Sequence, residues 1–511
     1  MELELQKDHY EYCLQLPAMS MMREESTETI VPDYSPDIAR IVDVSASFFL
    51  LQQSISDTHL SASGTVKLSL LYMAEGVRGL RSMEYAMPCE YAATLPEDCS
   101  AASVEGIVCR VQARTLNPRK LFTQVEIEWK VVPYRNSSFD ICGQIPGQEE
   151  YAIETRSEEH EISLIRAAES REFTFSDDLT LPGGKAGIAE LLRASATPHV
   201  TECKSLGSKV ILKGVVCVTL LYNADGGELC AYAEELPFSQ ILDGYNGGDS
   251  LSVSTILSVS GCEIHTDGSG LSDGARTVSV RLLLNAFMVL RESINICCIT
   301  DLYSTSCELD GQIVPLSFRK TPSVRLVQQT AKEQIDTGAE ARRVLYADVA
   351  FGSAGIRKAD DRAVLFASAV LKVLYLDDAG VPFSAERKVE LSAETDLEQG
   401  AQIEIERVCE GDITANANGN SIELRFPVEF ILSASEPVHC SCLTSLDAEF
   451  PEAVSQSKPS LVLRALNEGE RLWDIAKNYR TTVDEILTAN ELNGAESVRI
   501  GQMLLIPRKR V

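Results

Sequence analysis

The chain has 511 residues with 75 acidic and 46 basic side chains, a formal net charge of −29. A chain this acidic repels phosphate backbones, so a general nucleic-acid-binding protein is excluded. Hydrophobic residues make up 45% of the sequence, enough for packed cores, and no run of about 18 apolar residues marks a membrane span. The length corresponds to about three or four domains.

The N-terminal residues, from Met1 to Tyr12, alternate acidic and apolar side chains and lack the order of a secretory signal. The 15 cysteines are scattered singly, often inside apolar runs such as the one from Val215 to Val218. Cysteine used as a small hydrophobic residue is typical of a reducing cytosol rather than of a disulfide framework. We therefore expect a protein that is made and kept inside a cell.

One strand-like segment occurs three times, at spacings of about 150 residues. It ends at Tyr72, Tyr222 and Tyr375, and a glycine precedes the tyrosine by eight residues in the first two copies, whereas the third copy has Ala367. These two copies also agree upstream, and the third lacks a convincing counterpart of that segment. The matching upstream residues are Pro32, Ile38, Ala39, Ile41 and Val42 in the first copy and Pro182, Ile188, Ala189, Leu191 and Leu192 in the second.

Each copy continues with a turn rich in Gly, Asp and Asn, a second strand, and a run of alternating apolar and polar residues. These runs cover residues 124–132, 277–284 and 422–430. Alternation with a period of two predicts half-buried antiparallel strands. We therefore expect small β-rich modules, each with a short helix near Ile38 or Ile188, joined as tandem domains because the period is too long for a solenoid.

A different pattern follows a segment rich in Ser, Gln and Pro. Leu472, Ile475, Ala476 and Tyr479 lie on one face of a helix, and Thr482 with Glu485 forms a capping box before a second helix. With a strand on either side, this module has the order β-α-α-β. The predicted fold class is mainly β, with three repeats at 1–146, 147–300 and 301–445, a linker at 446–460 and the last module at 461–511.

The segments from Gly469 to Ala476 and from Gly501 to Pro507, with Tyr479 and Asn490 between them, closely resemble a LysM domain. LysM domains generally bind N-acetylglucosamine-containing glycans, such as peptidoglycan or chitin, in a shallow groove between two loops. The resemblance implies a partner- or glycan-binding site formed by Gly469, Glu470, Arg471, Leu472, Trp473, Asn490, Leu492, Asn493, Gly494, Arg499 and Ile500.

The sequence departs from the LysM pattern in two places. Glu470 and Arg471 replace the usual Asp-Thr pair, and Ile500 replaces the usual proline before Gly501. A long cation at the groove rim can obstruct a sugar or contact a protein carboxylate, so the sequence favours protein recognition and leaves glycan binding open. For Trp473, the alternative to a binding role is a structural role beside the helix core. The basic tail from Arg508 to Arg510 either steers the module to an acidic partner or only improves solubility.

The three repeats, with their Pro-x5-Ile-Ala segments and Gly-x7-Tyr strands, look like SPOCS domains. Three such copies before one LysM domain resemble the SipL- and SpoVID-like family of spore-coat morphogenetic proteins. This resemblance implies a non-enzymatic scaffold in the mother-cell cytoplasm, at the forespore surface, that binds the coat ATPase SpoIVA. The alternative is a glycan-binding protein that anchors to the spore cortex or cell wall. The oligomeric state is left open.

No motif predicts an enzyme, a cofactor or a metal site. The six histidines are dispersed, and the cluster from His439 to Cys442 has no second Cys/His pair at zinc-site spacing. Cys297-Cys298 is expected in a core. The glycine-rich pieces at 181–185 and 268–270 lack the phosphate-loop pattern and are interpreted as turns.

Overall fold

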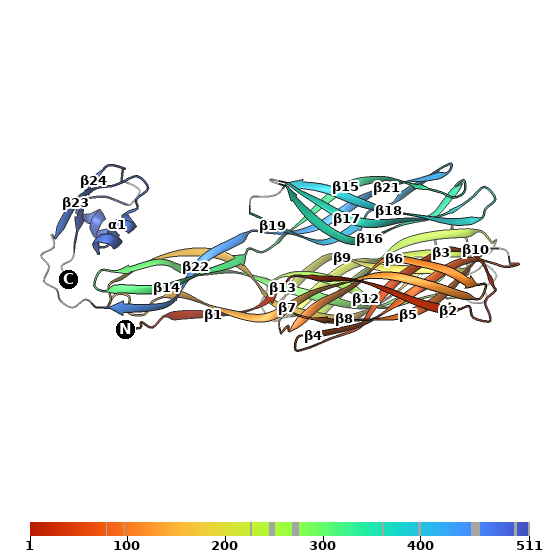
Figure 1. The fold of residues 1–511 in the computed structure, drawn as a ribbon, viewed down its shortest axis with the longest axis horizontal. Helices are drawn as coiled ribbons and strands as arrows, with labels where there is room; N and C mark the ends of the chain where they lie inside the picture. The colour runs from red at the N-terminus through yellow and green to blue at the C-terminus, as the bar shows by residue number, and fades with distance from the viewer. Residues whose placement is uncertain are drawn as a thin grey trace.

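The computed structural model describes the whole chain except residues 78, 97, 225–226, 245–250, 268–274, 360–361, 397–399, 451–459, 495–497 and 509–511. The fold is mainly β, as the sequence predicts, and the described residues contain two helices, both near the C-terminus. Figure 1 shows an elongated molecule with a broad body of packed sheets, a narrow stalk, and a small C-terminal module at the end of that stalk.

Each repeat folds into two sheets that pack face to face. The first sheet has three strands and turns toward the other repeats. In chain order its strands are β3 (Ile38–Ser56), β4 (His59–Ala74) and β5 (Leu80–Thr94) in repeat 1; β9 (Ile188–Leu206), β10 (Lys209–Ala224) and β11 (Leu229–Asp243) in repeat 2; and β16 (Arg343–Ala359), β17 (Arg362–Leu376) and β18 (Pro382–Asp396) in repeat 3.

In the second sheet of each repeat, the last long strand lies in the middle. It pairs on one side with the strand that opens the repeat and on the other with the strand that comes directly before it in this sheet. These strands are β2 (Met19–Ile30), β7 (Lys120–Gln144) and β6 (Ala101–Asn117) in repeat 1; β8 (Ile153–Thr180), β13 (Thr277–Ser304) and β12 (Leu251–Asp267) in repeat 2; and β15 (Ser323–Asp336), β21 (Ser421–Ser435), β19 (Gln402–Glu410) and β20 (Thr414–Asn418) in repeat 3.

The stalk consists of three antiparallel ribbons, one from each repeat. Strand β1 (Gln6–Gln15) pairs with the end of β7, the first half of β8 pairs with the end of β13, and β14 (Glu308–Arg319) pairs with β22 (Pro437–Glu449). Buried side chains from all three ribbons, including Cys142, Cys298 and Cys440, form the stalk core. Cys298 is therefore buried as predicted, whereas Cys297 is exposed.

The expected short helix near Ile38 and Ile188 is wrong, because both residues begin strands, β3 and β9. The pairing of β3 with β4 shifts register after Ile38 and again after Ile41, and β9 has matching shifts against β10. Such β-bulges break the period-two alternation, so apolar residues fall three and four positions apart and imitate a helix face.

The third repeat does contain the upstream segment. Val344 pairs with Tyr375, just as Ile41 pairs with Tyr72 and Leu191 with Tyr222. The repeated tyrosines are buried, and in repeats 1 and 2 the hydroxyl group donates a hydrogen bond to the loop that precedes the first strand of this sheet. The repeated motif is therefore a device that holds this loop against the central strand.

The three repeats close into a ring. β5 of repeat 1 packs against β9 of repeat 2, β11 of repeat 2 against β16 of repeat 3, and β18 of repeat 3 against β3 of repeat 1. Leu71, Leu221 and Leu374, from equivalent positions, meet in one buried cluster. Each repeat therefore contacts both of the others around a common axis.

A buried ion cluster joins the repeats beside this axis. Asp43 of repeat 1 is 5% exposed, and its carboxylate lies 2.5 Å from Arg193 Nη1 of repeat 2 and 3.2 Å from Lys372 Nζ of repeat 3. Arg193 also donates to the Ser69 carbonyl oxygen, and Lys372 to that of Val44. All members of the cluster are paired, as a buried charge requires.

The boundary at residue 300 falls inside β13, which continues to Ser304, and β22 runs past residue 445 to Glu449. Most of the segment expected as a linker, 451–459, lies outside the described residues, as do the glycine-rich piece 268–270 and Lys509 and Arg510 of the basic tail. Neither described helix is long and apolar enough to cross a membrane.

Candidate binding site

The C-terminal module has the predicted β-α-α-β order. Its elements are β23 (Leu461–Ala465), α1 (Leu472–Tyr479), α2 (Val483–Ala489) and β24 (Met503–Pro507), and the two strands pair with each other. Ile475, Ala476 and Ile486 from the helices pack on Leu504 and Ile506 from β24. The capping box also forms, since Thr482 Oγ1 accepts a hydrogen bond from Glu485 N at 3.1 Å.

Four of the predicted site residues stabilise the module itself. Glu470 turns back to form an ion pair with Arg464 and accepts a hydrogen bond from Asn467 N at 3.2 Å. The amide of Asn490 bridges α2 and β24 through bonds to Ile486 and Leu505, and the side chains of Leu472 and Leu492 belong to the core. These side chains are engaged within the module rather than in a groove.

Trp473 lies against the stalk. Its indole Nε1 donates to Asp301 Oδ2 at 2.7 Å, and its ring meets the edge of Tyr303 with centroids 4.9 Å apart. Both partners are near the end of β13. Trp473 therefore has a structural role, as the alternative interpretation of the sequence expected. It joins the C-terminal module to the stalk instead of supporting the helix core.

The docking contact includes residues that the sequence analysis missed. Lys477 and Arg480, next to Trp473 on α1 and its C-terminal cap, form ion pairs with Asp301 and Glu308 of the stalk. Tyr303 enters the core of the C-terminal module, and its hydroxyl donates to the Thr481 carbonyl oxygen at 2.8 Å. The spacing of Trp473, Lys477 and Arg480 along one helix face was the sequence feature that could have indicated this contact. The stalk residues that these three side chains contact lie about 170 residues earlier in the chain, beyond the range of any local pattern.

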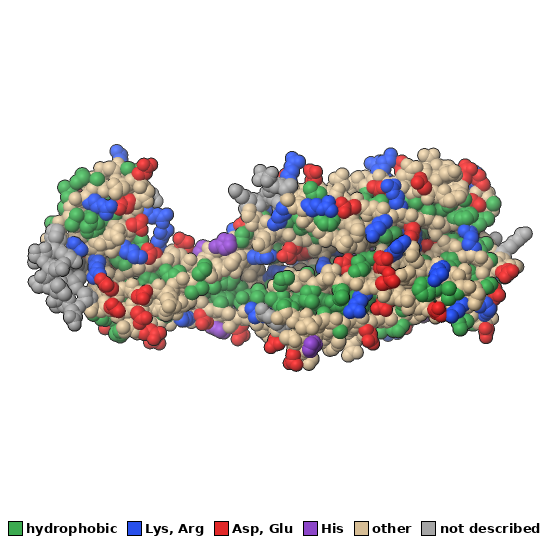
Figure 2. Space-filling model, in the orientation of Figure 1, with side chains coloured by type: hydrophobic (Ala, Val, Ile, Leu, Met, Phe, Trp, Pro, Cys, Tyr) green, Lys and Arg blue, Asp and Glu red, His purple; other side chains and the backbone are tan. Residues whose placement is uncertain are grey.

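Asp301 is ionised in this contact. Burial opposes its charge, but the hydrogen bonds from Lys477 and Trp473 outweigh that effect and hold the pKa of Asp301 below its usual value. Burial also raises the pKa of Tyr303, so its hydroxyl stays protonated as a donor. The contact is thus a charged and aromatic latch between module and stalk, and Figure 2 shows open space between the module and the body.

The remaining predicted residues form an accessible rim. Gly469, Arg471, Asn493, Arg499 and Ile500 are exposed, and Gly494 is half-buried. Gly469 has φ 78°, a left-handed conformation that favours glycine and turns the loop outward. Arg471 forms no ion pair with any described residue, and Ile500 exposes 68% of its surface. This rim, defined by Arg471, Arg499 and Ile500, is cationic and apolar.

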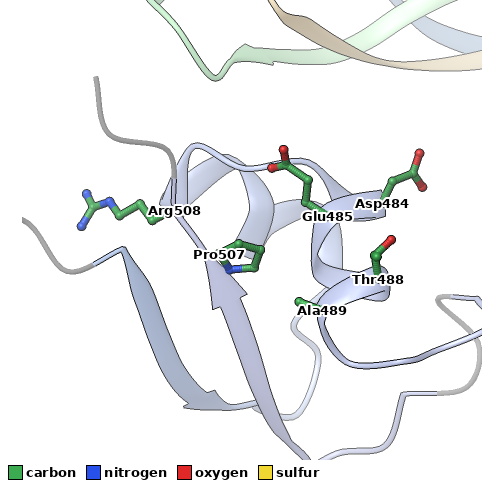
Figure 3. A pocket seen from close by; sticks show the side chains of 6 residues that line it. All are labelled: Asp484, Glu485, Thr488, Ala489, Pro507 and Arg508. Carbon is green, nitrogen blue, oxygen red and sulfur yellow. The ribbon is translucent and has the colours of Figure 1, made fainter.

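A shallow depression lies elsewhere on the module. Figure 3 shows its lining by α2 and the end of β24, with Asp484, Glu485, Thr488, Ala489, Pro507 and Arg508. Arg508 of the predicted basic tail borders this depression, and its side chain points away from Asp484 and Glu485. Leu461 pairs with Pro507, whereas the rim lies next to the other end of the hairpin, so the depression and the rim are separate surfaces.

Comparison with known protein families identifies two domains in the chain. The SipL SPOCS domain matches residues 187–264, from the loop before β9 into β12, and the LysM domain matches residues 467–507. The chain carries a SipL-type SPOCS domain followed by a LysM domain. No curated protein and no solved structure matches the chain.

These matches confirm the resemblance on which the sequence analysis relied. The SPOCS match lies within repeat 2 at residues 187–264, and repeats 1 and 3 share the strand order and register of repeat 2 in the structure. The SPOCS domain relates the protein to sporulation, and the LysM domain is of a glycan-binding type.

Proposed function

We propose that this protein is a non-enzymatic scaffold of spore-coat morphogenesis that binds the coat ATPase SpoIVA at the forespore surface. The observation that carries the proposal is the placement of the LysM domain. Its α1 face is held against the end of the stalk, and Arg471, Arg499 and Ile500 of its rim are exposed. A domain held in this way can present one surface to a partner at a distance from the ring.

The composition of the rim supports a protein partner. Two guanidinium groups and an exposed isoleucine suit a surface with carboxylates and apolar side chains, whereas a neutral glycan offers no counter-charge. The acidic carboxylate of Glu470, which could have neutralised Arg471, is committed to Arg464. Neither Arg471 nor Arg499 forms an ion pair with a described residue, although the Asp474 carboxylate accepts a hydrogen bond from Arg471 N. In a chain with a net charge of −29, these two arginines favour encounter with an acidic patch.

The LysM match itself favours a second function, in which the domain binds peptidoglycan or another N-acetylglucosamine glycan and anchors the protein to the cortex or wall. Both functions use the same rim, so one titration separates them. The full chain is required, because Tyr303 of the stalk is part of the LysM core.

The test compares binding of purified SpoIVA and of a chito-oligosaccharide to the full chain and to the variant Arg471→Ala. We expect binding to SpoIVA and a loss of affinity of about 10- to 100-fold in the variant, since a charge-assisted hydrogen bond contributes about 1.5–3 kcal/mol. Arg357→Ala on β16 is the matched control, because that arginine pairs with Glu390 far from the LysM domain. Binding of the sugar alone would establish the anchoring function instead.

A further inference from the structure

The strands that open the repeats leave three sheet edges along the body. β2 and β15 are terminal strands of their sheets, and β8 pairs with β13 alone beyond its single pairing with β1 at Ile165. An unpaired edge presents backbone donors and acceptors to any extended chain, and natural proteins block such edges with charged side chains. The three edges are equivalent positions in one chain, so each is a control for the others.

Two of these edges carry acidic side chains. β2 contains Glu24, Glu25 and Glu28 with a single arginine, and the outer half of β8 contains four carboxylates with a single arginine. The opening stretch of β15, residues 323–332, has two cations and no carboxylate. It also exposes Val324 by 68% and Leu326 by 59%. In this stretch β15 is therefore a basic edge, opposite in charge to the other two.

We propose that β15 pairs edge to edge with β2 of a second copy of this chain. In an antiparallel register that places Ile30 opposite Leu326, Glu24 lies opposite Lys332. Ile30 is 70% exposed, so its contact with Leu326 buries two large apolar side chains that face solvent in a single copy. Lys332 pairs with Glu423 in its own sheet but still exposes 67% of its side chain, and a second carboxylate can approach it.

The structure also marks where this pairing ends. Arg387 of β18 donates to the Gln334 carbonyl oxygen at 2.5 Å and lies 3.6 Å from Glu333, so it caps the β15 edge directly after the paired stretch. Figure 1 places β15 and β2 on opposite margins of the body. A contact between two different surfaces does not close on itself when the surfaces face apart, so copies join into open chains rather than a two-fold dimer.

The proposal is tested by sedimentation velocity of the full chain over a wide range of concentration. We expect species larger than a dimer to grow with concentration, and Leu326→Glu to weaken association about tenfold by placing a carboxylate against the acidic β2 edge. The matched control is Leu283→Glu, an exposed leucine on β13, which is paired on both sides. A chain that stays monomeric at every concentration, or that stops at a dimer, would overturn the proposal.

Charge reversal identifies the strands involved. Lys332→Glu and Glu24→Lys should each reduce association, and the double variant should restore it, because the opposite charges then meet again with their signs exchanged. Equal loss in the double variant would remove β2 as the partner of β15. Both residues are exposed, and thermal unfolding of each variant checks that the fold is kept. SpoIVA binding is a separate readout, so this proposal and the proposed function succeed or fail independently.

Discussion

Asp43 is the residue on which the contact of all three repeats depends. Burial alone would favour its neutral form, but Arg193 and Lys372 reverse that preference and hold its pKa below the usual value. Nearby Asp348 shows the opposite behaviour, because burial raises its pKa and its side chain hydrogen-bonds Tyr346. The pKa values of two neighbouring carboxylates are therefore shifted in opposite directions according to their partners.

Replacing Asp43 with Asn should lower the free energy of unfolding by about 3–5 kcal/mol, since it removes the carboxylate that pairs with the largely buried Arg193 and Lys372. Urea unfolding at neutral pH measures the loss, and Asp33→Asn at a fully exposed site is the control. A depressed pKa contributes stability above the unfolded value of about 4 that is lost as pH falls through the folded pKa. The difference between wild type and Asp43→Asn should therefore shrink only in acid; a constant difference down to acid pH would contradict this origin.

Gly214 is required by the close approach of two strands. A Cβ atom at this position would lie 2.2 Å from the His199 carbonyl oxygen, at a register shift between β10 and β9. We expect Gly214→Ala to destabilise the protein by about 1–3 kcal/mol through overpacking. Gly183→Ala, where a Cβ would meet nothing, should be close to neutral. Thermal unfolding of both variants tests this prediction. Equal melting temperatures would show that the backbone at Gly214 moves to accommodate the Cβ atom without loss of stability.

At the scale of elements, the stability of the contact between the LysM domain and the stalk depends on the negative charge of Asp301. Asp301→Asn should release Trp473 into water, because the amide offers the indole and Lys477 no negative charge. The chain has two tryptophans, and the other, Trp129, is fully buried. In a Trp129→Phe background, a red shift of the emission therefore reports Trp473, and Asp484→Asn on the far helix is the control.

The same latch should respond to acid. Since the pKa of Asp301 is lowered in the docked state, docking is stable above the free value of about 4 and weakens as pH falls through the docked pKa. Emission of Trp473 should stay constant from neutral pH to about pH 5 and shift to the red below that. A shift near neutral pH would assign the latch to another group.

The sequence predicted elements where the pattern is local. Period-two alternation located the long strands, and capping residues located α2, because these signals depend on neighbours in the chain. The prediction failed at Ile38, where β-bulges produce helical spacing, and the contact of Trp473 with Asp301 was not predicted because the two residues are remote in sequence. For the LysM site, the sequence identified the exposed rim but also included Glu470 and Asn490, which the resemblance alone could not separate from groove residues.

At the scale of the whole molecule, the ring predicts that the repeats unfold together. Leu374 of repeat 3 is 2% exposed and packs with leucines of the other two repeats. Leu374→Ala should cost about 2–5 kcal/mol and should lower amide protection in β4, β10 and β17 alike. Hydrogen exchange followed by mass spectrometry measures all three strands in one experiment. Loss of protection confined to β17 would mean that the repeats are independent domains.

The stalk also ties the first residues of the chain to one of its last strands. Leu3 N donates to the Leu446 carbonyl oxygen at 2.8 Å, and Leu3 packs into the stalk core beside Leu443 and Leu446. At a synthesis rate of about 5–20 residues per second, a ribosome needs roughly 20–90 s to make the strand that receives Leu3. Until then Leu3 lacks its partners Leu443 and Leu446, although the first ribbon already packs on β8 and β13. Premature termination before β22 therefore leaves Leu3 without the strand that buries it.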